Sequence, residues 1–349
     1  MRRTIGIISF LLLIIMSLNA RSYVEEKIQF TTGDGLTLSG YLTKPAKPAA
    51  TPALILQLGS GKGTTDSEAR PYNPFAEIAR KIADHGFAVL RFDKRGTGYN
   101  SANGSFEDST FNDYVSDFKA AVSYMQGREE VSKKSLFYMS HSLGGQIIMT
   151  AAADLPPTGI ILSASPGRSF MEYNIEQLRY LYEFGEGLKG QSLSKKVEED
   201  RKFNSLLADP EEACRQYPQR CTKHGTKIII DGQNSEFWKE ISAINPRLLV
   251  KKVHCPVLVI NGTSDWVISS ENDAKTIFAA LNPDKKNRLK ILYGLDHFFV
   301  KTPSKRASIH SFLKAGQGAP AAMKMHPWFI SELEKWLDSV PQIQSGGDL

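Results

Sequence analysis

The stretch Leu136–Ala153, LFYMSHSLGGQIIMTAAA, decides the fold. Its beginning, Leu136 to Met139, is typical of a buried strand, and the Ala-rich run from Gln146 to Ala153 predicts a helix. A tight turn of small residues lies between them. Strand, sharp turn and helix are the setting of a nucleophile elbow, in which the turn lifts one serine into a strained, exposed position. The pattern predicts Ser142 as a nucleophile.

The turn departs at one position from the usual Gly-x-Ser-x-Gly pattern. Ser140 stands where the first glycine is usual, whereas Gly144 keeps the second. Serine is also small, so the departure is compatible with the turn. The competing interpretation is an ordinary strand-to-helix turn with incidental serines. A base, an acid and an oxyanion hole elsewhere in the chain must decide between the two.

Apolar runs alternate with segments of helical periodicity on both sides of this stretch. The alternation predicts an α/β fold, with a mostly parallel central sheet and helices on both of its faces. The first two runs flank Gly33-Asp34-Gly35 and are expected to form a β-hairpin. Strands are predicted at 27–32, 36–42, 53–58, 87–92, 159–162, 256–261 and 288–293, and helices at 75–85, 111–125, 272–281 and 328–337.

The alternation stops between residues 166 and 245. This segment is polar and rich in predicted helix, with one short apolar run at Ile228–Ile230, and the sheet pattern resumes after it. We therefore expect a helical cap or lid at 166–245, inserted into a core formed by 21–165 and 246–349. A detached helical domain is the alternative.

The first twenty residues have the features of a secretory signal peptide. Arg2 and Arg3 precede an apolar run from Ile5 to Met16, and the small residue Ala20 follows. The run is short for a membrane-spanning helix, which needs about 20 apolar residues. We expect residues 1–20 to direct export to the periplasm or the medium, with only transient membrane contact. An uncleaved anchor is the alternative.

The composition narrows the classes of function. Apolar residues make up 41% and charged residues 23% of the chain, which is ordinary for a globular protein. The formal charge of +6 comes from scattered basic residues rather than a stripe, so no nucleic-acid partner is expected. No CxxC motif or His/Cys cluster at zinc spacing occurs, so the sequence predicts no zinc site. The oligomeric state cannot be read from the sequence.

Three cysteines are present, and export would expose them to an oxidising compartment. Seven residues of unbroken helix span about 10.5 Å, which is too far for a disulfide between Cys214 and Cys221. Pro218 interrupts that helix, so the sequence leaves this bridge open. Cys255 precedes an apolar strand and is expected to be a small buried hydrophobic residue.

A serine nucleophile needs a base to take its proton and an acid to orient the base. In open parallel sheets, catalytic groups gather just beyond the carboxyl ends of strands. Asp265 follows the strand 256–261, and His297 follows the strand 288–293. The chain order Ser142, Asp265, His297 is the order expected of an α/β-hydrolase triad. His141 adjoins the nucleophile and is expected to point elsewhere.

An oxyanion hole needs two backbone N–H groups aimed where negative charge develops. One is expected from Leu143, the residue after the nucleophile. The other is expected from the loop that follows the strand 53–58, where Gly59-Ser60-Gly61 allows close backbone approach. Ser60 is the candidate. Asp93 ends another strand, but Arg91 and Arg95 beside it favour a structural ion-pair role.

These motifs together resemble the α/β-hydrolases, in particular the bacterial esterase and serine-aminopeptidase-like group. The resemblance covers roughly 27–165 and 245–337, with Leu58-Gly59 where the family often has His-Gly. It implies hydrolysis of an ester or, less often, a peptide, without a metal or organic cofactor. The matching segments are 54–61, 86–98, 140–145, 257–265 and 294–297.

The sequence thus predicts an exported serine hydrolase that cleaves a small-molecule carboxylic ester through an acyl-enzyme. An aminopeptidase-like serine peptidase with the same triad is one alternative. A non-catalytic binding protein on a hydrolase scaffold is another.

Overall fold

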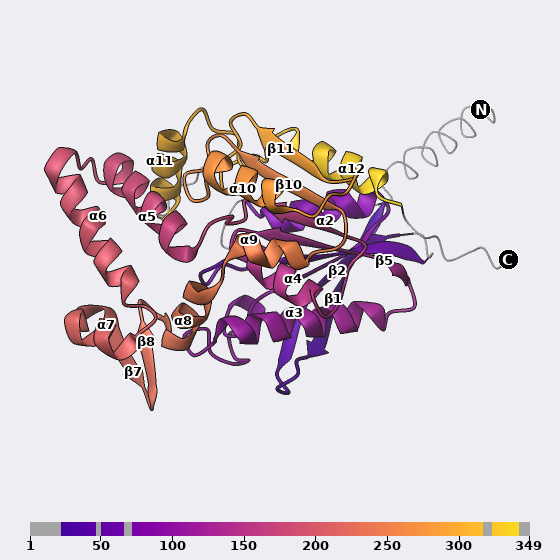
Figure 1. Cartoon of the computed structure of the whole chain (residues 1–349). Coiled ribbons are helices and arrows are strands. Elements are labelled where there is room, and N and C mark those ends of the chain that lie inside the picture. The colour runs from indigo at the N-terminus through magenta and orange to yellow at the C-terminus, as the bar shows by residue number, and fades with distance from the viewer. Residues whose placement is uncertain (1–21, 47–49, 66–71, 317–322, 342–349) are drawn as a thin grey trace, which may run out of the picture.

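The computed structural model describes residues 22–46, 50–65, 72–316 and 323–341 (Figure 1). Its centre is an eight-stranded sheet with the strand order β1-β2-β4-β3-β5-β6-β10-β11. The strands are β1 (Tyr23–Thr31), β2 (Thr37–Pro45), β3 (Thr51–Gln57), β4 (Ala88–Phe92), β5 (Val131–His141), β6 (Gly159–Ser163), β10 (Val257–Gly262) and β11 (Arg288–Leu292).

The sheet is mostly parallel, as predicted. β1 and β2 form the expected antiparallel hairpin, and β2 pairs antiparallel with β4. From β4 to β11 every neighbouring pair is parallel. The carboxyl ends of β3, β5, β10 and β11 therefore lie at one edge of the sheet, where loops from distant parts of the chain can meet.

Helices cover both faces of the sheet (Figure 1). On β5, Phe137 and Met139 belong to one buried cluster and Tyr138 to the other, because successive strand residues point to opposite faces. The first cluster includes residues of α2 (Pro74–Asp84) and α12 (Phe329–Ser339). The second includes residues of α3 (Phe111–Gln126), α4 (Gly144–Ala152) and α10 (Lys275–Ala280).

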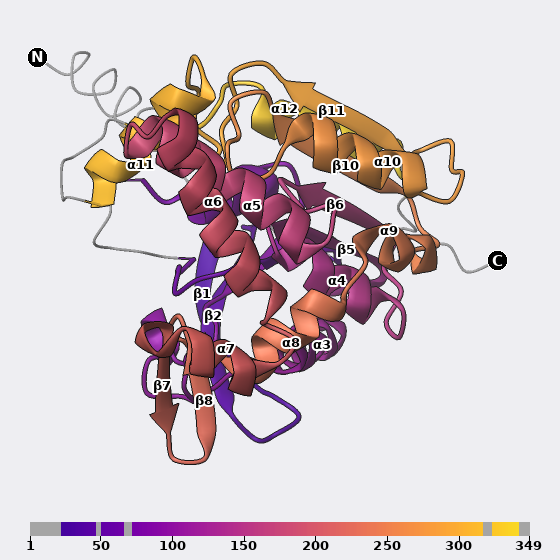
Figure 2. The ribbon, with the colours of Figure 1, turned by 60° about the vertical axis from the view of Figure 1, so that its left-hand side comes forward.

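The chain between β6 and β10 forms most of the layer above this sheet edge. Figure 2 shows α6 alongside α5, with β7 and β8 extending as a hairpin at the far end. The segment contains a three-stranded antiparallel sheet, β7-β8-β9, of which only the Ile228–Ile230 run had a sequence signal. Its elements are α5 (Phe170–Tyr180), the π-helix η2 (Leu181–Gly185), α6 (Gly190–Ser205), α7 (Pro210–Gln216), η3 (Pro218–Arg220), β7 (Cys221–His224), β8 (Lys227–Ile230), β9 (Gln233–Asn234), α8 (Ser235–Ala243), α9 (Pro246–Leu249) and η4 (Val250–Lys252).

A disulfide between Cys214 and Cys221 links the end of α7 to the start of β7. The bend at Pro218 brings the two Cα atoms to 5.6 Å, a separation that the sequence alone left open. Cys255 is free and half-buried, and burial raises the pKa of its thiol to about 12. That thiol is inert at neutral pH, as expected of a packed cysteine.

Among the described residues, the short helix α9 and the longer helix α11 were not predicted from the sequence. α11 (Lys305–Gly316) follows the β11 loop and packs against the π-helix η2. His310 Nε2 lies 2.9 Å from the carbonyl oxygen of Phe184, which belongs to η2. The core thus contributes a helix to the same layer as the inserted segment.

The expected signal peptide, residues 1–20, lies outside the described residues. In the part of the chain that is described, no helix is both long enough and apolar enough to cross a membrane.

Candidate active site

Ser142 lies in a sharp turn between β5 and α4, with a backbone φ of +56°. This left-handed conformation is strained for a residue other than glycine, as a nucleophile elbow requires. Its N–H donates to the Ser163 carbonyl oxygen at 3.0 Å. A Cβ at Gly144 would lie 2.7 Å from the Gln57 carbonyl oxygen, and one at Gly145 would lie 2.5 Å from Ser165 Oγ. Both glycines are therefore needed for the turn to pack against β3 and β6.

The serine in the usual glycine position fits this packing. Ser140 is buried, and its hydroxyl donates to the Ile161 carbonyl oxygen at 3.3 Å. Its Oγ also lies 3.1 Å from Ser165 Oγ. The hydroxyl is therefore satisfied inside the protein, and a serine here costs little compared with glycine.

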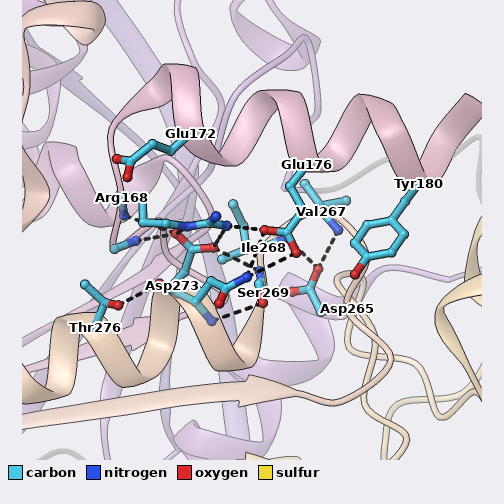
Figure 3. Close-up of polar contacts among 12 residues, drawn as sticks. Arg168, Glu172, Glu176, Tyr180, Asp265, Val267, Ile268, Ser269, Asp273 and Thr276 are labelled. Atoms are coloured by element: carbon cyan, nitrogen blue, oxygen red, sulfur yellow. Dashed lines mark hydrogen bonds and ion pairs between the residues drawn. The ribbon is translucent and has the colours of Figure 1, made fainter. Parts of the chain in front are cut away.

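His297 and Asp265 are paired beyond the ends of β11 and β10. His297 Nδ1 lies 3.0 Å from Asp265 Oδ2, and both side chains are buried. The other carboxylate oxygen accepts N–H bonds from Val267 at 2.9 Å and Ile268 at 2.8 Å (Figure 3). This fixes the carboxylate, assigns the Nδ1 proton to the Asp265 side and leaves Nε2 as an acceptor.

Ser142 and His297 are brought to the same edge without a hydrogen bond between Ser142 Oγ and His297 in the described part of the chain. Their side chains are recessed, with 7% and 5% of their surfaces exposed. Hydrogen bonds between a nucleophile and its base are often long in the unliganded enzyme and tighten when substrate binds.

His141 does not point away from this site, and the sequence-based expectation that it would is wrong. Its Nε2 lies 2.8 Å from the His297 carbonyl oxygen, and the two rings are 4.6 Å apart between centroids. Burial, with a smaller contribution from His297, lowers the pKa of His141 to about 3. His141 is therefore neutral at neutral pH, and its Nε2–H donates to the backbone that carries His297.

The loop Gly59–Gly61, which we call the oxyanion loop, follows β3 and packs against the elbow. A Cβ at Gly59 would lie 2.7 Å from the Cβ of Ser142, so only glycine allows this approach. Within the described residues, the N–H groups of Ser60 and Leu143 donate to no protein acceptor. Leu143 also precedes the first turn of α4, the positive end of the helix dipole.

The loop Asp265–Asp273, which we call the acid loop, is fastened by a buried carboxylate. Asp273 is fully buried and accepts hydrogen bonds from the N–H groups of Gly167, Arg168 and Ser269 at 3.0 to 3.1 Å. The Arg168 guanidinium pairs with Asp273 at 2.7 Å and with Glu176 of α5 at 2.6 Å (Figure 3). The network ties the loop of Asp265 to the start of the inserted segment.

Asp296 supports the backbone on either side of His297. Its Oδ1 accepts N–H bonds from Phe298 and Val300, both at 2.9 Å, and Oδ2 accepts from the Ser308 hydroxyl at 2.9 Å. Burial raises the pKa of this carboxyl group to about 6. Asp296 faces the chain and α11, not the ring of its neighbour.

Asp93 is structural, but through hydrogen bonds rather than the ion pair inferred from the sequence. Its Oδ1 accepts from the N–H of Thr65 at 2.6 Å and its hydroxyl at 2.8 Å, and Oδ2 accepts from the Tyr99 N–H at 3.1 Å. Arg95 instead pairs with Asp117 and Asp34.

The described residues contain no cluster of three or more His, Cys, Asp or Glu side chains that could hold a metal ion. The polar groups that converge on the elbow are suited to acyl transfer: a strained hydroxyl, an imidazole with a free nitrogen, a buried carboxylate and two unbonded N–H groups.

A sheet of this order with an elbow at β5 defines an α/β-hydrolase. The family described as "Serine aminopeptidase, S33" matches residues 69–301, and the chain belongs to it. Esterase EstD of Thermotoga maritima is 22% identical over 303 residues, which are 86% of this chain and 65% of that esterase. The chain thus spans just under two thirds of the length of this relative.

Solved structures share the fold. The α/β hydrolase GrgF from Penicillium sp. sh18 superposes with a TM-score of 0.53 at 19% identity, over 85% of this chain and 97% of that one. The Pyrococcus furiosus esterase Pf2001 gives a TM-score of 0.53 at 14% identity, over 91% of each chain.

Two neighbours of the site were missed from the sequence. His141 was set aside because it adjoins Ser142, although a residue at the carboxyl end of a strand belongs to the same edge. Lys94 follows β4 at that edge too. The strand-end rule that selected Asp265 and His297 would have selected both.

Proposed function

We propose that this protein is a serine esterase that hydrolyses carboxylic esters through an acyl-enzyme. The hydrogen bond between His297 and Asp265, beside a strained serine at an elbow, carries this proposal. Family membership and the esterases among its relatives support the reaction class.

In this mechanism Ser142 Oγ attacks the acyl carbon while His297 Nε2 takes its proton. The N–H groups of Leu143 and Ser60 bind the oxyanion that forms, and their donation strengthens as charge develops on it. His297 then protonates the leaving alcohol, and Asp265 stabilises the imidazolium in both steps. Water, activated by His297, releases the acid. Each step uses groups already fixed by the surrounding backbone.

The test is hydrolysis of short p-nitrophenyl esters by the wild type and by Ser142→Ala. We expect kcat to fall by at least about a thousandfold, because the variant lacks the hydroxyl that attacks the ester. Ser140→Ala, which removes a hydroxyl from the same turn, is the matched control and should stay within about tenfold. Equal rates in the wild type and Ser142→Ala would refute the nucleophile.

The family name also favours a second reaction, release of amino acids from peptides by the same residues. Aminoacyl-arylamides distinguish the two. Turnover of these amides without turnover of esters would replace the esterase with a peptidase. A wild type that neither hydrolyses substrate nor reacts with a fluorophosphonate probe would indicate a binding protein on a hydrolase scaffold.

We further propose that the protein is exported and that residues 1–20 are removed. The disulfide between Cys214 and Cys221 supports this, because such bonds persist in oxidising compartments. Mass spectrometry of the protein from an exporting bacterial host should show a mature chain that begins near Arg21, with the bridge formed. A full-length chain confined to the cytoplasm would contradict export.

A further inference from the structure

Lys94, in the loop after β4, is a buried cation: only 3% of its surface is exposed. Lysine is seldom buried to this degree without a carboxylate partner, because its ammonium loses the solvation of water. In the described part of the chain, its hydrogen bonds go to two backbone carbonyl groups and to no carboxylate. Burial lowers the pKa of Lys94 to about 7. The esterase mechanism above gives this group no role.

The groups around Lys94 do not offer it an ion pair. Burial lowers the pKa of Lys94 and the charge of the adjacent Asp93 raises it in part, but the Asp93 oxygens accept their hydrogen bonds from Thr65 and Tyr99. The ring of Phe106 lies 5.4 Å from Lys94 Nζ and that of Tyr114 lies 5.8 Å away. On the side of the elbow lies His141, whose pKa is lowered mainly by burial, with Lys94 making the smallest contribution. The ammonium is thus enclosed by rings and peptides.

The two carbonyl groups that Lys94 contacts belong to the oxyanion loop. Nζ donates to the Gly59 oxygen at 2.8 Å and also to the Gly61 oxygen. The Gly59 carbonyl and the Ser60 N–H form one peptide group, which is trans, so they point in opposite directions in one plane. A donor that fixes this carbonyl therefore fixes the direction of the Ser60 N–H. It also polarises the peptide and makes that N–H a stronger donor.

We propose that Lys94 is a positioning residue of the oxyanion hole, which holds the Gly59–Ser60 peptide with its N–H towards the acyl oxygen and adds positive charge behind it. This rests on the esterase mechanism proposed above. The interaction gains strength only when the oxygen becomes negative, so Lys94 acts on the transition state more than on the bound ester. That use of the charge offsets the cost of burying it.

The experiment compares Lys94→Met, which keeps the length of the side chain without charge or donors, with Lys94→Gln, which keeps a neutral donor. The control is Lys62→Met: Lys62 is exposed, yet its Nζ also lies 5.6 Å from the Phe106 ring. We measure kcat and KM for a p-nitrophenyl ester at pH 6, and the inhibition constant of butylboronic acid, whose adduct with serine mimics the tetrahedral intermediate. Fluorophosphonate labelling counts the active sites.

For Lys94→Met we expect kcat to fall about a hundredfold at nearly constant KM, with an equal loss of boronate affinity. Lys94→Gln should lie between this variant and the wild type, and Lys62→Met should stay within twofold of the wild type. A folded Lys94→Met with kcat within threefold of the wild type would overturn the proposal. So would a rise in KM alone, or a fall in kcat with unchanged boronate affinity.

If Lys94→Met does not unfold cooperatively, Lys94→Gln tests the proposal instead, through kcat, KM and the inhibition constant of butylboronic acid. Failure of the underlying function has a different signature: the wild type itself would not be labelled, or Ser142→Ala would be as active as the wild type. In that case the Lys94 variants would share the wild-type rates.

Discussion

The oxyanion loop and the acid loop are each held by one buried charge, but in opposite ways. Within the described residues, Lys94 binds the oxyanion loop through two carbonyl groups and makes no hydrogen bond to a carboxylate, whereas Asp273 binds the acid loop through backbone N–H groups and is neutralised by Arg168. A buried charge that is paired and fully hydrogen-bonded stabilises structure locally. A buried charge that is not hydrogen-bonded to an opposite charge acts electrostatically on the other groups around it. The paired charge of Asp273 therefore stabilises the fold, whereas the charge of Lys94 can act on the proposed reaction.

The largest effect on kcat is expected at Asp265, which lies in the acid loop. Asp265→Asn keeps an oxygen for the Val267 and Ile268 N–H groups but presents an amide to His297 Nδ1, which favours the wrong tautomer. We expect kcat to fall on the order of 10³- to 10⁴-fold with little change in the unfolding midpoint. Ester hydrolysis and thermal unfolding measure the two quantities. A kcat within tenfold of the wild type would contradict the role of Asp265.

The next prediction distinguishes the role of Asp273, which we expect to be structural, from that of Lys94. Arg168→Met leaves the Asp273 carboxylate buried without its cation, so we expect the free energy of unfolding to fall by about 3–5 kcal/mol. Because Asp273 keeps its backbone donors, kcat of the folded fraction should change less than tenfold. Urea unfolding and active-site titration give both values.

The matched comparison is Lys94→Met, which should show the reverse. Removing Lys94 relieves the desolvation of its ammonium, which is a larger effect than its interaction with the Asp93 charge, so the free energy of unfolding should stay within about 1 kcal/mol of the wild type while kcat falls. If both variants lost stability and rate in parallel, the distinction between a structural and a functional buried charge would not hold here.

A smaller, pH-dependent effect is expected from Asp296. Its pKa is raised from 3.8 to about 6 in the folded protein, so folding favours the protonated carboxyl group. This contribution to stability is complete below about pH 4 and is lost as the pH rises through 6. The unfolding free energy of the wild type, relative to Asp296→Asn, should therefore decrease by about 2–3 kcal/mol between pH 4 and pH 7. A constant difference across this range would show that folding does not shift the pKa of Asp296.

Much of the core follows from local pattern in the sequence. Phe137, Tyr138 and Met139 alternate between the two faces of β5, and such apolar runs are sufficient to locate the strands of a sheet covered on both sides. Asp265 and His297 could be found because parallel strands end at a shared edge. The sequence does not show why serine is tolerated at position 140 in place of the usual glycine. The structure shows that its hydroxyl has a hydrogen-bond partner in Ser165.

The remainder depends on contacts between distant residues. The pairing of Arg168 with Asp273 joins positions 105 apart, and no local sequence pattern connects the two residues. β7 to β9 are short and largely polar, so their strand signal is weak. α11 has only a short apolar stripe, Ile309, Phe312 and Leu313, and Ile309 and Leu313 pack against Gly185 of η2 rather than the sheet. The Cys214–Cys221 bridge required the backbone bend at Pro218.

The left-handed backbone of Ser142 also bears on how this protein could be altered by selection. A strained non-glycine residue costs on the order of 1–3 kcal/mol, and glycine adopts the same conformation without that strain. The substitution that most easily stabilises the elbow, Ser142→Gly, therefore also removes the proposed nucleophile. Selection for thermal stability alone would favour inactive variants. Engineering of this protein must therefore select for turnover and thermal stability together.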